Sequence, residues 1–308
     1  MILYTFNRFL QMIPVLFGAT FLIFALTFLV PGDPVTALAG DRPLPESTVA
    51  QIRLAYRLDE PFVAQYTYYM LGVFQGDFGI DFYGRPVFDV VAGRLPVTLS
   101  LALTAWVLKI FIAITIGVIA GVRRNGPFDY SALMFTVLLL GVPSFVLAIG
   151  VQWLFGIQLG WLPVAGIGAG WPIAFLLPAM VIALESAAGL ARLTRTSLVD
   201  VLNADFMQMA RAKGLSGSRV VCGHGLRNAM LPVVTFLGLS LAGMIGGTVI
   251  IEAVFNIPGI GGLMVDSIQN GEGTTVVGIA TMLVLAYLVF NLAVDLLYGV
   301  IDPRVRLH

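Results

Sequence analysis

The sequence predicts an all-α membrane protein with about six transmembrane helices. Of its 308 residues, 58% are hydrophobic and only 11% are charged, whereas a soluble domain carries about 25% charged residues. Such a chain cannot cover its apolar surface with polar groups in water, so its solvent must be lipid. Backbone groups in lipid must be hydrogen-bonded within the spanning segment, which makes helices the expected form.

Six apolar stretches reach the length of about 20 residues that a helix needs to cross a bilayer. We place them at 9–30, 96–121, 131–156, 173–190, 230–251 and 274–299. The first is longer than the core of a signal peptide, about 7–15 residues, so we expect a retained anchor, although "ALAG" at 37–40 resembles a cleavage site. The chain then divides into three parts. These are a first helix (1–30), an extracytoplasmic loop or cap (31–95) and a five-helix core (96–308) with a cytoplasmic loop at about 191–229.

The basic residues predict the orientation of the chain, because Lys and Arg gather in cytoplasmic loops. With the N-terminus inside, eleven basic residues fall on the inside. These are Arg8, Arg123, Arg124, Arg192, Arg195, Arg211, Lys213, Arg219, Arg227, Arg304 and Arg306. The short outer connections near 157–172 and 252–273 contain no Lys or Arg. We therefore expect a multi-pass protein of the cell membrane with both termini in the cytoplasm.

The outer loop 31–95 is long for a connection between spans. It contains eight acidic residues and many aromatic ones, as in "QYTYYM" and "GDFGIDFYG". "STVAQIRLAYRL" and "DEPFVAQYTYYMLGVF" predict two helices separated by a turn, with Ser47 as a cap for the first. Its aromatic content argues against disorder, so we expect a small ordered helical cap rather than a flexible tether.

A short helix at 203–214 interrupts the cytoplasmic side. Asn203 can cap its start, Asp205 lies in the first turn, and Gly214 can end it in a left-handed conformation. Arg211 and Lys213 lie in the last turn, where the helix dipole favours cations.

Phe206, Met209 and Ala210 fall on one face of this helix, at positions i, i+3 and i+4. A helix this short is marginal alone, so it should pack against something, and Met and Phe suit a protein groove. The alternative, which these residues leave open, is that 191–229 is simply a long loop that obeys the positive-inside rule.

Several long motifs, in the right order, resemble the dipeptide/oligopeptide permease family, which supplies the membrane subunits of ABC importers. They are "ARAKGL", "HGLRNAMLPVVTFLG", "GGTVIIEAVFNIPGIG" and "NLAVDLLYGVIDPR", and the match is strong from about 178 to 306. "RLTRTS" at 192–197 fits the pattern before the family's cytoplasmic loop. Upstream, "LVPGDP", "LDEPFVAQY" and "GDFGID" fit the family's first subunit type, which bears a long outer loop. The resemblance thus covers nearly the whole chain.

This resemblance implies a type I ABC importer permease fold in the inner membrane of a bacterium. It implies that the helix at 203–214 is the coupling helix, which seats in a cleft on an ATPase subunit. The implied contact residues are Asn203, Asp205, Phe206, Met209, Ala210, Arg211, Lys213 and Gly214. The wider superfamily carries a Glu-Ala-Ala…Gly signature here, of which Ala210 and Gly214 are kept while Gln208 replaces the acid.

The resemblance also implies the partners of the chain. We expect a homologous second permease, two ATPase subunits or domains, an extracytoplasmic substrate-binding protein and the lipid bilayer, but no nucleic acid. No G-x-x-x-x-G-K-[ST] loop occurs in the sequence, so ATP and Mg²⁺ are expected on the partner ATPases. The chain itself should be neither catalytic nor cofactor-bearing. His224, His308 and the one cysteine, Cys222, have no metal-ligand spacing. We interpret "GIGAG" at 166–170 and "GIGG" at 259–262 as turns.

Charged residues within the spans keep two other functional classes open. An ion-gradient-driven secondary transporter or channel usually has ionisable residues deep in its spans. Here the candidates are Lys109 near mid-span, and Glu185 and Asp295, which the predicted boundaries put one to two turns from the cytoplasmic ends. A non-transporting scaffold is the other alternative, and ATP-dependent uptake would discriminate among all three.

Two further features are candidate parts of the pathway. Lys109 can snorkel, pair with an acid on a partner or face a wet cavity. Glu252 and Phe255, beside a Pro-Gly turn at the outer end of the fifth span, can form a gate or an ordinary interfacial loop. Gly117-x-x-x-Gly121 and Gly243-x-x-x-Gly247 permit close helix contacts, either within the chain or with a second subunit. The substrate itself is left open among dipeptides, oligopeptides, haem, nickel and glutathione.

Overall fold

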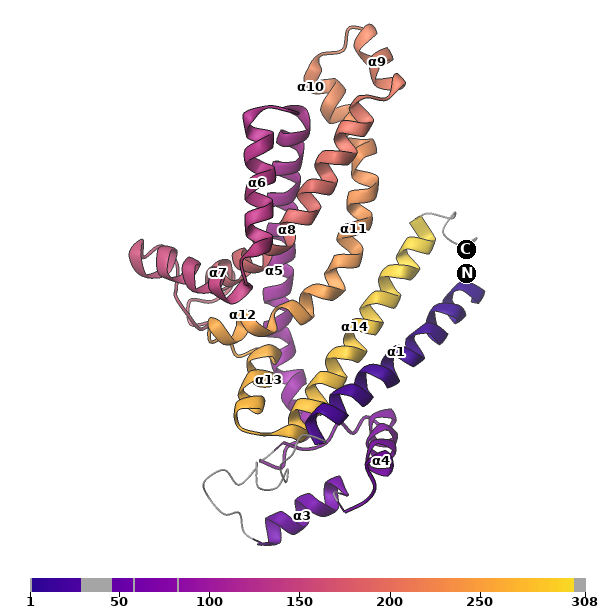
Figure 1. Ribbon diagram of the computed structural model, residues 1–308, viewed down its shortest axis with the longest axis vertical. Coiled ribbons are helices and arrows are strands. Elements are labelled where there is room, and N and C mark those ends of the chain that lie inside the picture. Colours follow the sequence, from indigo (N-terminus) through magenta and orange to yellow (C-terminus); the bar gives the residue numbers. More distant parts are fainter. Residues whose placement is uncertain (1, 29–45, 58, 82, 302–308) are drawn as a thin grey trace. The chain divides into compact units, whose positions relative to one another are not determined.

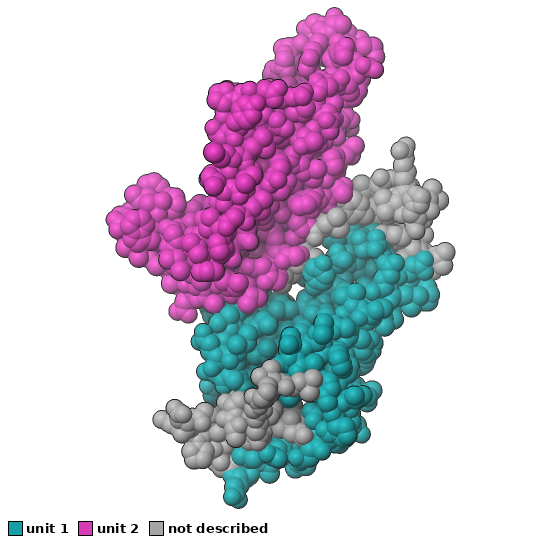
Figure 2. All heavy atoms as spheres, viewed as in Figure 1, with its two compact units in different colours: residues 1–98, 258–308 teal, residues 99–257 magenta. Residues whose placement is uncertain are grey.

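A computed structural model describes residues 2–28, 46–57, 59–81 and 83–301. The arginines predicted inside at 304 and 306, and the first part of the outer loop up to residue 45, lie outside these ranges. Regular structure in the described residues is helical, apart from one isolated bridge between Ile80 and Pro86. The chain forms two compact units, residues 1–98 with 258–308, and residues 99–257 (Figure 2).

The predicted number of spans is confirmed, but three of the predicted ranges need correction, and one of these is the fifth span, predicted at 230–251 and found at Gly217–Gly238. Five helices are long and apolar enough to cross a membrane, at Thr5–Phe28, Val87–Val122, Ile173–Leu202, Gly217–Gly238 and Gly273–Leu296. The stretch predicted to span at 131–156 is instead a bent pair, Pro127–Gly141 and Ser144–Gln158, with an angle of 108° between its halves. The fourth span extends well beyond the predicted end at residue 190.

In the first unit, α1 (Ile2–Phe28) packs along α14 (Gly273–Ile301), as Figure 1 shows. Near one end of the pair, Arg8 Nε lies 3.4 Å from a carboxylate oxygen of Asp295. At the other end the helices approach closely, since a Cβ on Gly273 would lie 2.6 Å from the Thr27 methyl group. Asp295 lies in the last two turns of α14, which agrees with the position predicted for it near a helix end.

The outer loop contains the two predicted helices, α3 (Glu46–Tyr56) and α4 (Phe62–Phe74). Ser47 lies inside the first turn of α3, so its predicted role as the cap is wrong. Aromatic side chains of α4 meet those of α1, with Tyr66 and Phe24 rings 5.7 Å apart. Because α4 is fixed in this way against a spanning helix, this part of the loop is an ordered cap rather than a tether.

The core of the first unit joins this cap to three other helices. Its buried residues are Val73, Phe78, Val87, Val91, Ile260, Leu263 and Ile279. They come from α4, the turn that follows it, the start of α5 (Val87–Val122), α13 (Ile260–Gln269) and α14. The Thr98 hydroxyl accepts the backbone N–H of Ile260 at 2.9 Å and so caps α13. The turn predicted at 259–262 is therefore wrong beyond Gly259, because α13 begins at Ile260.

The second unit is a bundle of the rest of α5 with α6 (Pro127–Gly141), α8 (Ile173–Leu202) and α11 (Leu226–Gly247). Gly117 brings α5 against α8 so closely that a Cβ there would lie 2.6 Å from the Ala191 carbonyl oxygen. The close helix contact predicted for Gly117 and Gly121 is therefore made within the chain, between α5 and α8. A Cβ on Gly243, by contrast, would have no heavy atom within 4 Å.

Two prolines explain where the bundle departs from straight spans. Pro127 starts α6 at the first helical position, which suits its fixed φ angle. Pro143 ends it, because the residue before a proline is disfavoured in the α conformation, and Val142 is extended. The chain restarts at an angle as α7 (Ser144–Val151), continued by the π-helix η1 (Gln152–Gln158). In the loop that follows, Gly166 and Gly170 have φ angles of 75° and 71°, which confirms the predicted turn there.

Candidate functional site

The predicted cytoplasmic helix is present as α9 (Asp205–Ala212), at one end of the α8–α11 pair (Figure 1). It is preceded by Ala204, whose extended backbone turns the chain away from α8. Gly214 follows with a φ angle of 76°, and its N–H donates to the Arg211 carbonyl at 3.0 Å. The left-handed stop predicted for Gly214 is confirmed.

Asn203 does not cap α9, which corrects the prediction. Its backbone N–H still donates to the Val199 carbonyl at 3.2 Å, so it closes α8 instead. The cap position of α9 is Ala204, which has no side-chain oxygen, and no side-chain cap hydrogen bond forms. The helix is therefore stabilised at its start by the favourable position of Asp205 in the first turn and by packing.

The apolar residues of α9 divide between the chain and the outside. Met207 is fully buried, and its methyl group lies beside Gly225, against the end of α8. Phe206 and Met209 remain 43% and 63% exposed. One side of α9 is thus anchored on its own subunit, while two large apolar side chains are presented outward. Sequence reasoning missed Met207, which lies between the residues of the predicted apolar face, Phe206 and Met209, and about 100° around the helix from Phe206.

The remaining predicted contact residues surround this exposed face. Asp205, Arg211, Lys213 and Gly214 are exposed, and Ala210 is partly buried. A single turn, α10 (Gly217–Arg219), and a second π-helix, η2 (Val220–Gly225), lead from α9 into α11. Cys222 lies on η2 and is exposed.

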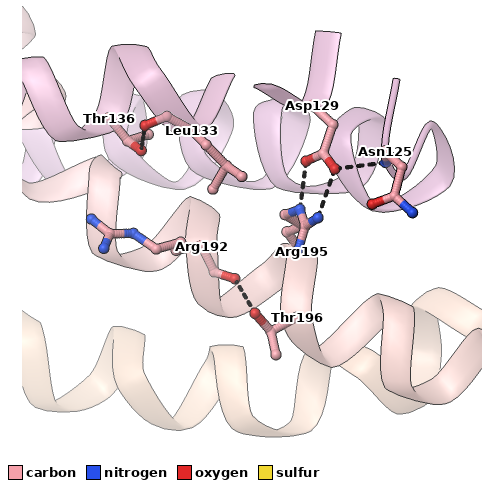
Figure 3. Close-up of polar contacts among 7 residues, drawn as sticks. All are labelled: Asn125, Asp129, Leu133, Thr136, Arg192, Arg195 and Thr196. Carbon is pink, nitrogen blue, oxygen red and sulfur yellow. Dashed lines mark hydrogen bonds and ion pairs between the residues drawn. The ribbon is translucent and has the colours of Figure 1, made fainter. Parts of the chain in front are cut away.

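Direct side-chain contacts join α8, which leads into α9, to the rest of the bundle. Arg195 of α8 forms a two-pronged ion pair with Asp129 of α6, and one of its hydrogen bonds measures 2.6 Å (Figure 3). Asp129 is only 1% exposed. Its carboxylate also accepts the backbone N–H of Asn125 at 2.9 Å, so it joins the turn between α5 and α6 to α8.

Two further bonds attach α11 to the same bundle. The Ser197 hydroxyl of α8 donates to the Ala229 carbonyl at 2.9 Å. The Trp106 indole of α5 donates to the Leu237 carbonyl at 3.3 Å. Together with buried alanines and leucines between α5, α8 and α11, these contacts join the three helices into one packed bundle.

The predicted pathway residues are buried within the subunit. Glu252 in α12 (Val249–Val254) is 0% exposed, and Phe255, which ends that helix, is 1% exposed. The Phe255 carbonyl accepts the N–H of Gly166 at 2.8 Å. Lys109 on α5 is 1% exposed, and its Nζ lies 5.5 Å from the centre of the Phe236 ring. None of the three opens onto the surface of the subunit, and Lys109 does not snorkel to an interface.

Glu185 lies further from the end of its helix than the predicted span suggests. The predicted span ended at residue 190, which put Glu185 near the end of the helix. Instead α8 continues to Leu202, 17 residues beyond Glu185, or about 25 Å at 1.5 Å per residue. This carboxylate is exposed in the middle of the helix.

The described residues contain no group of three or more His, Cys, Asp or Glu side chains that could hold a metal ion.

The chain matches known transport proteins along nearly all of its length. Residues 113–307 match the family of binding-protein-dependent transport system inner membrane components, and residues 1–102 match the N-terminal region of such membrane components. The chain belongs to this family. It is the permease subunit of an ABC importer, a multi-pass inner membrane protein.

Two curated relatives of this permease are full-length matches. The oligopeptide transport system permease protein of Haemophilus influenzae is 36% identical over 99% of this chain and 100% of its own. The glutathione transport system permease protein of Escherichia coli K12 is 38% identical over 99% of each. A crystal structure of an amino acid ABC transporter with histidines matches with a TM-score of 0.52 and 17% identity, over 68% of this permease and 92% of that chain. This last likeness supports the type I importer permease fold.

Proposed function

We propose that this permease forms half of the translocation pathway of an ATP-driven peptide importer. The other half is a homologous second permease. One ATPase subunit docks at α9, and a second docks at the corresponding helix of the other permease. The ATPases carry the ATP and Mg²⁺, and an extracytoplasmic binding protein delivers the solute. Closure of the ATPases moves the paired α9 helices and switches the pathway between its two openings, because nucleotide binds the two conformations with different affinity.

The exposed apolar face of α9 is the observation on which this proposal rests. A helix of eight residues is too short to be stable alone, yet it exposes Phe206 and Met209 rather than burying them. Such a pair fits a groove on a partner protein, as in other helix-in-groove contacts. Because Met207 fixes the opposite side of α9 to α8 and η2, a force on the exposed face reaches α8 directly.

The side of the membrane on which the two termini lie follows from the assignment of α9 as the ATPase-docking helix. If α9 faces the cytoplasm, both termini are cytoplasmic and the α3–α4 cap faces outward, where the binding protein arrives. Val73 and Phe78 pack in the core of the first unit, so deletion of the whole cap would unfold it. Exposed side chains are the better test of docking, such as Leu54 on α3, which is 78% exposed.

The substrate assignment rests on the relatives. Their names specify oligopeptides in one case and glutathione in the other, and both are peptide-like solutes with several polar groups. We assign a short peptide to this importer. Competition of labelled uptake by dipeptides, oligopeptides, glutathione, haem and nickel, in cells with the complete transporter, tests that assignment.

Phe206→Asp tests the docking role of α9. In proteoliposomes with the assembled transporter, we expect normal membrane insertion but loss of ATP-driven uptake, because an acid replaces an apolar anchor. Gln208→Ala is the matched control, since Gln208 is an exposed polar residue of the same helix. Gly214→Val should act in the same direction, because its φ of 76° is costly for a β-branched residue.

Normal uptake in Phe206→Asp and Gly214→Val would contradict the coupling role. Uptake by the wild-type complex that needs an ion gradient but no ATP would instead indicate a secondary transporter. No uptake at all by a complete complex would indicate a scaffold.

A further inference from the structure

Glu185 is an exposed carboxylate within the apolar part of α8. It is 12 residues from Ile173 and 17 from Leu202, or about 18 and 25 Å along the helix axis. The apolar run of α8 continues past Glu185 and ends before Arg192, so this carboxylate lies about 10 Å inside the apolar part of the helix, measured from Arg192. At the centre of a helix in lipid, an acid costs about 2.5–3.5 kcal/mol on insertion scales. An exposed Glu185 therefore does not face lipid.

The exposed face of α8 carries a row of mostly polar residues, called the polar row below. Glu185, Gly189, Arg192, Thr196 and Asp200 are all exposed, and their spacings of four, three, four and four residues put them on one face of a helix. The exposed face of neighbouring α5 is different. Leu103, Val107 and Phe111 are 53%, 59% and 71% exposed, as expected of a face in contact with lipid. The polar row on α8 instead suits an aqueous path.

An apolar contact surface lies beside this row. Phe236 of α11 is 38% exposed, and its ring edge lies 4.0 Å from the position that a Cβ on Gly189 would take. Glycine in a helix interior costs about 1 kcal/mol relative to alanine. Here it leaves the surface between Glu185 and Arg192 without a side chain, next to an aromatic ring.

The two charges of the row are well separated and opposite in sign. Glu185 and Arg192 are seven residues apart on α8, or about 10 Å along the axis. Figure 3 shows the Arg192 side chain directed away from the Asp129–Arg195 pair, so that pair does not neutralise it. An extended chain spans at most about 3.3–3.6 Å per residue, so about three residues cover this distance.

We propose that Glu185, Gly189, Phe236 and Arg192 form a binding site for a zwitterionic peptide of about three residues within the translocation pathway. Glu185 receives the protonated amino terminus, Arg192 receives the carboxylate, and Phe236 contacts an apolar side chain above Gly189. This inference rests on the proposed function, and it adds to that function the charge and the length of the solute.

The first test measures water access and charge preference without any substrate. Gly189→Cys is introduced into Cys222→Ser, which removes the one native cysteine, in the assembled transporter in proteoliposomes. Cationic and anionic methanethiosulfonate reagents are then compared. We expect both to modify Cys at 189. Glu185→Gln should lower the ratio of cationic to anionic rates on the order of fivefold, and Arg192→Gln should raise it, because the nearby charge attracts the opposite reagent.

Phe111→Cys, in the same Cys222→Ser background, is the control for a lipid-facing position and should stay unmodified. A Cys at 189 that neither reagent reaches would overturn the site, and would indicate that a second subunit covers this face. A charge preference that neither Glu185→Gln nor Arg192→Gln alters would overturn it as well.

The second test is ATP-driven uptake of trialanine. We expect Glu185→Gln and Arg192→Gln each to lower uptake at low concentration about tenfold while ATP hydrolysis by the complex stays intact. Unchanged uptake in both variants would overturn the site while leaving the importer function in place. Wild-type uptake that is independent of ATP would overturn the proposed function itself.

Discussion

Replacement of Asp129 by asparagine should strongly destabilise the second unit. In the native chain Asp129 is 1% exposed and accepts two hydrogen bonds from the Arg195 guanidinium and one from the Asn125 backbone. Asparagine has the same shape but no charge. It therefore leaves the Arg195 cation, whose side chain is 21% exposed, without its counterion.

Removal of one partner from a buried pair costs about 3–5 kcal/mol. Since Arg195 keeps some access to solvent, we expect the lower end, about 3 kcal/mol. At about 2 °C per kcal/mol for a chain of this size, the midpoint of thermal unfolding should fall by roughly 6 °C. The double variant Asp129→Leu with Arg195→Met removes both charges together, and it should lose much less, because an apolar pair can replace a buried ion pair nearly without cost.

The assay is thermal unfolding of the purified permease in detergent, followed by the loss of its monodisperse peak in size-exclusion chromatography. Thr196→Val is the control, because Thr196 is exposed on the same helix and its hydroxyl donates only to the Arg192 carbonyl. An Asp129→Asn variant whose unfolding midpoint lies within about 1 °C of the wild type would refute the reasoning. So would a double variant less stable than Asp129→Asn.

Three other changes test the packing and the cap. Gly117→Val should abolish stable folding, because its Cβ would meet the Ala191 carbonyl at 2.6 Å, whereas Gly243→Ala, with open space around it, should express normally. Tyr69→Phe should lower stability by about 1 kcal/mol through loss of the 2.8 Å hydrogen bond to Thr281, and no change in the unfolding midpoint would contradict that contact. Burial raises the pKa of the Glu272 carboxyl above its ordinary value of 4.5, so the folded state favours the protonated acid. The stability from Glu272 is then full below pH 4.5 and is lost as the pH rises through the raised pKa. Glu272→Gln should remove this loss of stability with rising pH and raise the unfolding midpoint at pH 7. A wild-type unfolding midpoint that increases with pH above pH 4.5 would contradict this prediction.

Features that depend on local chemistry could be predicted from the sequence. The stop at Gly214 needs only a residue that tolerates a positive φ, and the helices α3 and α4 follow from apolar periodicity between turn residues. The break at Val142 also has a local signal, since Pro143 follows it. The apolar sequence continues across this break, however, and for that reason we predicted a single span at 131–156.

Features that depend on where a long helix ends, or on what it packs against, could not be predicted. Asn203 satisfies the rules for a helix start, yet α8 still includes its N–H, so it serves the end of one helix instead. The distance of Glu185 from the end of its helix was misjudged for the same reason. The burial of Met207, Glu252 and Phe255 arises from tertiary contacts, which hydrophobic patterns along the chain do not specify.

The elbow between α6 and α7 has a consequence for the assembled membrane complex. The 15 residues of α6 rise about 22 Å, roughly 8 Å short of a full crossing of the hydrocarbon. The Val142 N–H still donates to the Leu139 carbonyl, but the last carbonyl groups of α6 leave the helical ladder below the headgroup layer. Fatty acyl chains offer such groups no hydrogen bonds, and irregular backbone is tolerated at that depth only against protein or water. The elbow must accordingly be sheltered by a neighbouring polypeptide or by a water-filled vestibule.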